Sequence, residues 1–239
     1  MTAPSSFDIA SIATIATPFK QKFAIPRQPN LAKAQGVITF GEGFNDINML
    51  KGIEHYSHLW LLFIFHQNLE RGWKSTVKAP RLGGNATMGV LASRSTHRPN
   101  GIGMSVVVNK GITSRNGQTQ LCVEGVDLVD GTPLIDVKPY ISYADRVDNA
   151  KDKLDDINPI PHRDVFFAPS LSSMLAKIET KHSDFSALVT AVLAQDPRPA
   201  YKQHLDNDEK IYRVTLYDID VGFTIKNAAV CVTELVQLG

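Results

Sequence analysis

The chain has 239 residues, of which 43% are hydrophobic, so it can form a sizeable core and is not globally disordered. Its 25 basic and 24 acidic residues give a formal net charge of +1. This balance excludes a uniformly basic protein, although it leaves room for a basic face on a neutral whole.

Neither a secretion signal nor a membrane span is expected. The N-terminus lacks a basic region followed by an apolar run, and the longest apolar run, Leu59–Phe65, is shorter than the about 20 residues that cross a bilayer. Cys122 and Cys231 are far apart and form no CxxC motif, which is typical of reduced thiols. The chain is therefore predicted to be soluble and cytoplasmic.

Apolar alternation and turn residues predict a series of short strands. Strands are expected at Ile9–Thr17, Ala34–Phe40, His58–Gln67, Ser105–Lys110 and Thr119–Val129, with a short helical or irregular connection at Phe44–Ile53. The run from His58 is apolar on both faces and predicts a fully buried strand. Arg115-Asn116-Gly117 predicts a hairpin, because an Asn-Gly pair accepts two positive φ values. Many short strands separated by turns favour an antiparallel sheet that is closed or nearly closed into a barrel.

Three polar segments interrupt these strands and could carry function. Arg27 and Gln28 stand between prolines, which suits a binding loop and a plain exposed loop about equally. The segment from Glu70 to Gly84 interleaves cations with Trp73, as expected for phosphate and base contacts with a nucleic-acid loop, or simply for a solvated loop. Its cations are Arg71, Lys74, Lys78 and Arg81.

The third polar segment is Gly89–Ser105, which is predicted to be a strand, a polar turn-bearing segment and a second strand. It places Arg94, His97 and Arg98 beside the turn Pro99-Asn100-Gly101. A single such residue is most often a surface residue, but three of them on a rigid support favour a site.

A linker at residues 147–163 precedes a part of different character. Helical spacing predicts helices at Ser170–Lys181 and Phe185–Gln195, with N-caps at Ser170 and at Ser183 or Asp184. Three strands follow, at Tyr212–Leu216, Val221–Ile225 and Val230–Val236. The predicted organisation is a mainly β barrel at residues 1–146 and a small α+β domain at residues 164–239.

Residue chemistry alone defines a β-barrel with a cationic polar pocket. The scattered histidines predict no metal site, and neither GxGxxG nor a P-loop is present, so the fold is not of the Rossmann type. His97, Arg98 and Asp136 leave open a hydrolase or nuclease that works without a methyl donor.

Several motifs in order resemble the TrmO (TsaA-like) family of S-adenosylmethionine-dependent tRNA methyltransferases. The barrel part carries PRQP at Arg27, HLW at His58, SRSTHRPN ending at Asn100, and DGTPLIDVKPY starting at Asp130, while DPRPAY at Asp196 matches the appended domain. The resemblance implies a single-sheet antiparallel barrel that binds S-adenosylmethionine as a homodimer. It also implies methylation of N6 of the threonylcarbamoylated adenosine beside the anticodon, within the anticodon stem-loop.

The resemblance also assigns residues to roles. Methyl-donor contacts are expected from Pro26, Arg27, Gln28, His66, Gln67, Arg94, Met104, Asp130, Gly131, Thr132, Pro133 and Leu134. Met104 replaces a leucine that is common in the motif, which is a volume-conserving change. The catalytic or substrate-facing set is His97, Arg98 and Asn100, and the tRNA-contacting set is Arg71, Lys74, Lys78, Arg81, Arg198 and Tyr201.

The implied reaction is in-line transfer of a sulfonium methyl group to an amine nitrogen of a base unstacked from its loop. His97 is a candidate to take the proton, because imidazole titrates near neutral pH. A module that binds S-adenosylmethionine or a nucleotide without turnover is the alternative.

Overall fold

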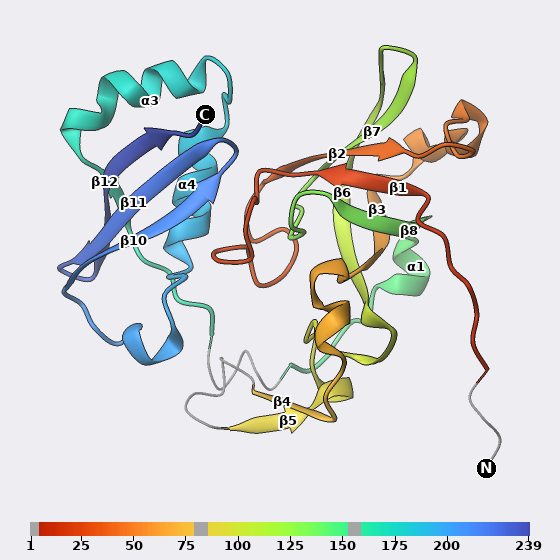
Figure 1. The fold of residues 1–239 in the computed structure, drawn as a ribbon, viewed down its shortest axis with the longest axis horizontal. Coiled ribbons are helices and arrows are strands. Elements are labelled where there is room, and N and C mark those ends of the chain that lie inside the picture. The colour runs from red at the N-terminus through yellow and green to blue at the C-terminus, as the bar shows by residue number, and fades with distance from the viewer. Residues whose placement is uncertain (1–4, 79–85, 153–158) are drawn as a thin grey trace.

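The computed structural model describes residues 5–78, 86–152 and 159–239. Its largest sheet closes into a barrel in the strand order β1–β2–β7–β6–β3–β8. All neighbours in it are antiparallel, and β1 closes the sheet by pairing Ile15 with Thr132 of β8. The strands are β1 (Ala13–Ala16), β2 (Gln35–Phe40), β3 (His58–Ile64), β6 (Ile102–Arg115), β7 (Gln118–Glu124) and β8 (Thr132–Pro139). The mainly β class is therefore confirmed (Figure 1).

Strand β3 shows how the barrel is filled. Leu59, Leu61 and Phe63 alternate into the core and are at most 5% exposed. The predicted strand is confirmed, but the prediction that both faces are fully buried is wrong, because the residues between them are only half-buried. Trp60 on the outer face donates a hydrogen bond from Nε1 to Asp145 at 3.1 Å and packs against the Tyr140 ring at 5.9 Å.

The β6–β7 hairpin has the predicted turn. Asn116 has φ 52° and Gly117 has φ 74°, so the two residues supply the positive angles that a tight turn between twisted strands needs. The Gly89–Ser105 segment differs from its prediction. Strand β5 (Thr87–Gly89) pairs with β4 (Thr76–Lys78) in a separate sheet, and β6 pairs with β3 and β7, so the two flanking strands do not form one hairpin.

Short helical turns connect the strands of the barrel part. They are η1 (Ile47–Leu50), η2 (Ile53–His55), η3 (His66–Arg71), η5 (Val90–Ala92), η6 (Pro99–Gly101) and α1 (Ser142–Asp145). The expected connection at Phe44–Ile53 thus contains a 3-10 turn. The first strand begins at Ala13 and not at Ile9, whose side chain is 59% exposed.

The C-terminal part packs helices against a sheet in the order β10–β11–β12–β9. It contains β9 (Val165–Phe167), η7 (Pro169–Leu171), α3 (Ser172–Glu179), α4 (Phe185–Ala194), η8 (Ala200–Lys202), β10 (Asp208–Leu216), β11 (Ile219–Lys226) and β12 (Ala229–Gln237). Both helices and the three later strands agree with the sequence, whereas β9, which runs parallel to β12, was not predicted. The N-cap residue of α3 is Leu171 and not Ser170 as predicted. Asp184 is the N-cap residue of α4, and its side chain makes no capping hydrogen bond.

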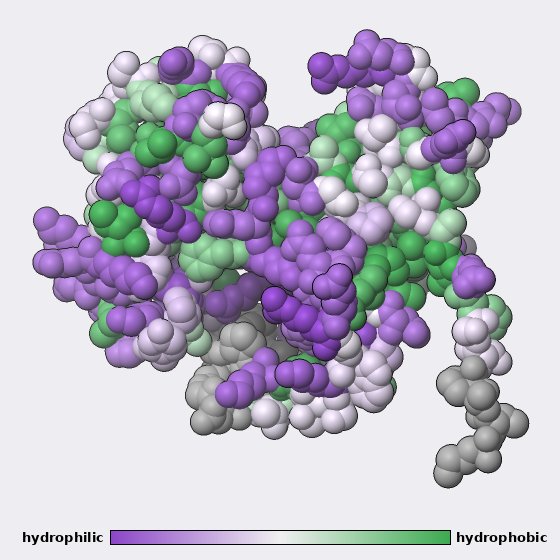
Figure 2. Space-filling view, in the orientation of Figure 1, coloured by the Kyte–Doolittle hydropathy of each residue, from purple (hydrophilic) through white to green (hydrophobic). Residues whose placement is uncertain are grey.

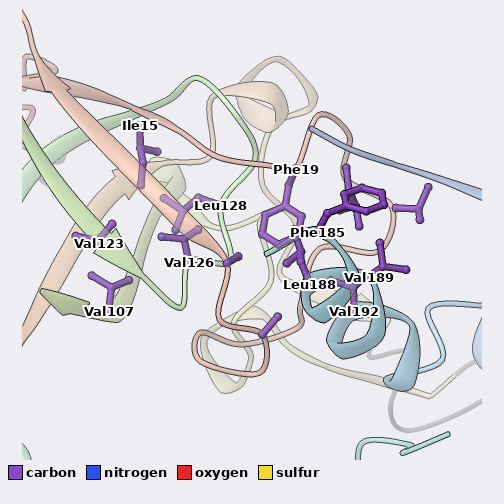
Figure 3. Packing of buried hydrophobic residues seen from close by; sticks show 14 of the residues in the cluster. Ile15, Phe19, Val107, Val123, Val126, Leu128, Phe185, Leu188, Val189 and Val192 are labelled. Carbon is purple, nitrogen blue, oxygen red and sulfur yellow. The ribbon is translucent and has the colours of Figure 1, made fainter. Parts of the chain in front are cut away.

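One hydrophobic core runs from the barrel into the C-terminal part. Phe19, which follows β1, is 1% exposed, and Phe185 of α4 is fully buried. Figure 3 shows Phe19 between barrel residues such as Leu128 and the side chains of α4. A bridge joins Phe19 to Leu216, and Tyr217 N donates to Pro18 O at 2.8 Å. The face shown in Figure 2 is mostly hydrophilic, with groups of hydrophobic side chains over both the barrel and the C-terminal part. Within the described ranges, no helix combines the length and apolarity that a membrane span requires.

Candidate functional site

A cavity of about 670 Å³ opens where β3 ends and β6 begins. Its walls come from the Lys22–Gln28 loop, the β3–η3 junction, the Ser93–Arg98 loop, the start of β6 and the segment between β7 and β8. Ile64 pairs with Ile102, so the end of β3 and the start of β6 meet at the same edge of the sheet. The volume lies within the about 300–1,000 Å³ that small-molecule sites occupy.

Two glycines allow close packing at the start of β6, and one of them, Gly103, lies against the aromatic floor of the cavity. A Cβ atom on Gly103 would lie 2.4 Å from Cε2 of Phe63 and 2.8 Å from Cζ of Phe65, so only glycine admits both rings. The two rings meet edge to face, with their centroids 5.2 Å apart. Gly101 has φ 60°, and a Cβ there would lie 2.7 Å from Leu69. The close packing at β6 fixes the floor of the site.

Basic side chains surround the cavity and are held by neutral partners. Arg94 donates from Nη1 to Gln28 Oε1 at 2.6 Å, and Arg98 donates from Nη1 to Ser93 O at 3.0 Å. Lys22 donates to Gln67 O at 3.3 Å and also to the side chain of Asn68. Burial lowers the pKa of Lys22, and the nearby Arg71 guanidinium lowers it further. These cations retain charge that can act on an anionic group of a ligand.

Asn68 ties two of the walls together. It is 6% exposed, accepts from Lys22, and donates from Nδ2 to Thr96 Oγ1. The sequence prediction missed this residue, although its position one residue after the expected His66-Gln67 pair was a signal. Its amide links the Lys22 loop to the Ser93–Arg98 loop.

Asp127 is the second residue that sequence reasoning missed. Its Oδ1 accepts a 2.6 Å hydrogen bond from Oγ of Ser105, which is 1% exposed. Burial raises the pKa of Asp127 to about 6, while the Ser105 hydrogen bond, its own backbone and the Arg94 charge act in the opposite direction. A signal existed, because Asp127 is a polar residue between apolar Val126 and Leu128, one turn before the predicted Asp130–Leu134 segment.

The structure brings together many of the residues predicted to contact the methyl donor. The lining includes Pro26, Arg27, Gln28, His66, Gln67, Arg94, Met104 and Thr132 of this set. It also includes Arg98, which was predicted to be catalytic or to face the substrate. These residues come from five separate segments of the chain.

Other predicted site residues lie outside the lining. Asp130 accepts from Thr17 N at 2.8 Å and from Lys20 Nζ at 2.6 Å, while Leu134 is fully buried in the barrel core. Asn100 is exposed at the η6 turn with φ 63°. His97 has a buried Nδ1 atom without a hydrogen-bond partner among the described residues. Gly131, Pro133, His97 and Asn100 are also absent from the described lining.

The residues predicted to contact tRNA separate into three groups. Arg71, Lys74 and Lys78 are exposed, as is Tyr201 at 72%, and Lys74 N donates to His97 O at 3.3 Å. Arg81 lies outside the described residues.

Arg198 is a correction to the sequence prediction. Its side chain is fully buried and donates two hydrogen bonds to Asp196, from Nε to Oδ1 at 2.8 Å and from Nη2 to Oδ2 at 2.7 Å. Asp196, also fully buried, accepts a further bond from Arg163 Nε at 2.8 Å. Arg198 therefore has a structural role in a buried ion pair, and its guanidinium is not accessible to a phosphate of tRNA.

The described part of the chain contains no group of three or more His, Cys, Asp or Glu side chains that could hold a metal ion. The cavity instead combines apolar walls, neutral hydrogen-bonding groups and cations. This combination suits an organic ligand that carries both a flat apolar portion and an anionic group.

Comparison with known proteins places this geometry in a family. Residues 14–146 match the family model of the tRNA-methyltransferase O N-terminal domain, and residues 161–238 match that of the TrmO C-terminal domain. The chain is 42% identical over 225 residues to the "tRNA (adenine(37)-N6)-methyltransferase" of Escherichia coli (strain K12), covering 94% of this chain and 95% of the relative. It is also 36% identical over 143 residues to a "Probable S-adenosyl-L-methionine-binding protein" of Archaeoglobus fulgidus, covering 60% and 36%.

A crystal structure of TrmO from Pseudomonas aeruginosa has the same fold. It superimposes with a TM-score of 0.81 at 34% identity and covers 99% of this chain and all of the other, 100%. Family models that match both parts in order, and a similar solved structure, agree with the motifs in the sequence. This chain belongs to the tRNA-methyltransferase O (TrmO) family.

Proposed function

We propose that this protein transfers the methyl group of S-adenosylmethionine to N6 of adenine 37 in tRNA, as the name of the Escherichia coli relative describes for that enzyme. We further propose that the acceptor adenosine carries a threonylcarbamoyl group on N6. The observation that carries the proposal is the cavity, whose cations and apolar floor suit the carboxylate and the purine of this donor. The chain aligns with that relative over 94% of its length.

The cavity fits the donor in size and chemistry. Its volume of about 670 Å³ accommodates a nucleoside with an amino-acid arm. Phe63, Phe65 and Leu128 offer apolar surface for the purine, and Arg27 and Arg94 offer cations for the carboxylate of the arm. When bound, S-adenosylmethionine supplies a methyl group on a positively charged sulfur. The proposed donor contacts are Pro26, Arg27, Gln28, His66, Gln67, Arg94, Met104 and Thr132.

Arg98 suits the acceptor side of the same cavity. Its Nη1 is engaged with Ser93 O, which orients the guanidinium and leaves other N–H donors for a second partner. A threonylcarbamoyl group ends in a carboxylate, and a guanidinium can bind that group with two parallel hydrogen bonds. Arg98 is therefore proposed to recognise the modification on the acceptor base.

An exposed basic surface leads to the cavity and is proposed to bind the anticodon stem-loop. Arg71 lies at the end of η3, close enough to cavity residue Lys22 to lower its pKa. Lys74 is bonded through its backbone to the Ser93–Arg98 loop, and Trp73 between them is 59% exposed. Cations beside an exposed aromatic ring suit phosphates and an unstacked base.

The remaining parts of the proposal concern organisation. Residues 1–146 are taken as the donor-binding domain, residues 147–163 as a linker and residues 164–239 as an appended domain. A homodimer and a cytoplasmic location, where tRNA is found, complete it.

The test is transfer of labelled methyl from S-adenosylmethionine to tRNA prepared with and without the threonylcarbamoyl modification. Label is expected only in the modified tRNA, at N6 of adenine 37. A double variant, Lys74→Glu with Lys78→Glu, should raise the KM for tRNA and leave donor affinity unchanged, because the exchanged charges lie outside the cavity lining. Donor binding without product on either tRNA would contradict the proposal and favour a binding module.

A further inference from the structure

The cavity contains one acid among its bases. In the described part of the chain, the titratable or charged side chains of the lining are Lys22, Arg27, His66, Arg94 and Arg98, which are basic, and Asp127. The donor and acceptor contacts proposed above leave Asp127 without a role. A half-buried carboxylate that lines a cavity beside cations is a candidate for a chemical role.

The backbone and a buried hydroxyl hold Asp127 in place. Val126 and Leu128 on either side are at most 2% exposed and pack in the core. Ahead of them, Gly125 N donates to Ala34 O at 2.8 Å. The Ser105 hydroxyl donates a hydrogen bond to Oδ1 at 2.6 Å, and both residues line the cavity. The carboxylate is therefore presented to the cavity in a fixed position, as a reacting group requires.

Methyl transfer to a carbamoylated N6 creates a need for a base. The nitrogen lone pair is delocalised into the purine ring and into the carbamoyl group, so this nitrogen is a poor nucleophile while it keeps its proton. A bond forms between N6 and the methyl carbon, the carbon–sulfur bond breaks with its electron pair staying on sulfur, and the N6 proton must leave. Lysine and arginine in their charged forms have no lone pair to accept it.

We propose that the Asp127 carboxylate takes the proton of the acceptor N6–H as the methyl group is transferred. This step rests on the function proposed above, and the proton passes from Asp127 to solvent after the methylated product leaves. Because burial raises the pKa of the group to about 6, Asp127 is ionised at neutral pH and yet more basic than an exposed carboxylate. Ser105 acts as a positioning residue, since its hydrogen bond orients the carboxylate and lowers that pKa.

Two other roles predict different kinetics. If the carboxylate served only to bind the cationic donor, its removal would weaken donor affinity. Such a carboxylate would stabilise the charged sulfonium of the bound donor more than the transition state, in which that charge is dispersed. His66 is the other group in the lining that could accept a proton. Variants at both positions separate these roles.

The experiment compares the wild type with Asp127→Asn, Asp127→Glu, Ser105→Ala and His66→Gln on modified tRNA from about pH 5 to about pH 8.5. Donor affinity is measured by calorimetry and folding by thermal unfolding. For the wild type, kcat/KM should rise through a pH of about 6 and then level off, because the ionised carboxylate is the active form. Asp127→Asn should lower kcat by roughly 10²- to 10⁴-fold, abolish this rise and bind the donor normally.

The other variants support or overturn the assignment. Asp127→Glu should keep the pH-dependent rise at a reduced kcat. Ser105→Ala should move the rise to higher pH, because it removes the hydrogen bond that lowers the pKa; this shift tests the assignment even if Asp127→Asn fails to fold. The proposal is overturned if Asp127→Asn keeps the wild-type kcat, if it weakens only donor binding, or if His66→Gln alone abolishes the rise. Failure of the wild type to methylate modified tRNA at any pH would instead contradict the function itself.

Discussion

Replacing Arg198 by alanine tests the correction that this residue is structural. Removing one partner of a buried ion pair costs about 3–5 kcal/mol, because the remaining charge is left uncompensated. Asp196 would keep its 2.8 Å hydrogen bond from Arg163, so we expect a loss of unfolding free energy at the lower end of this range, about 3 kcal/mol. For a chain of this size, that loss corresponds to a fall in Tm of about 6–12 °C.

Denaturant unfolding followed by circular dichroism measures the loss, and Tyr201→Ala is the matched control. Tyr201 lies on the same connecting segment but is 72% exposed, so its replacement should change the unfolding free energy by less than about 0.5 kcal/mol. At a temperature where Arg198→Ala stays folded, its affinity for tRNA should equal that of the wild type. A loss below about 1 kcal/mol together with weakened tRNA binding would refute the structural role.

Three further results are expected. The pKa of Asp127 rises on folding from 3.8 to about 6, so its protonation stabilises the folded protein below pH 4, and this stabilisation is lost as the pH rises through 6. The unfolding free energy of the wild type should therefore fall by an amount of order 3 kcal/mol across this range, and that of Asp127→Asn should not. Parallel pH dependences of the two proteins in denaturant unfolding would contradict the raised pKa. Gly103→Ala should lose about 1–3 kcal/mol of stability and weaken donor binding in calorimetry, because its Cβ meets Phe63; an unchanged affinity would mean that the aromatic floor is not part of the site. Phe19→Ala should cost about 3–5 kcal/mol in thermal or denaturant unfolding, since this ring is 1% exposed, and a cost near zero would show that the shared core contributes little.

Local chemistry explains which parts of the fold could be predicted. The Asn116-Gly117 turn follows from the backbone preferences of two residues, and the strand at His58–Ile64 follows from a short apolar run. Both signals are complete within a few positions of the chain. The pairing of β2 with β7 has no such local signal, because it depends on the register between Gln35 and Glu124.

The site was predictable in part for the same reason. The resemblance assigned Arg27, His66 and Arg94 to the site, and the structure brings all three to one cavity. They did not distinguish an exposed arginine from a buried one, since the burial of Arg198 depends on how Asp196 and Arg163 meet in three dimensions. Asp127 was missed because its surroundings depend on Ser105 of β6, which lies 22 residues away in the chain.

The segment after β1 has a consequence for how the two parts of the molecule communicate. Phe19 is clamped between the barrel and the C-terminal part, and only a few residues later the same segment supplies Lys22 and the Pro26–Gln28 wall of the cavity. The segment thus connects the shared hydrophobic core directly to the wall of the cavity. Because Phe19 contacts both parts, we expect a shift of the C-terminal sheet to move Arg27 and Gln28 in the cavity wall.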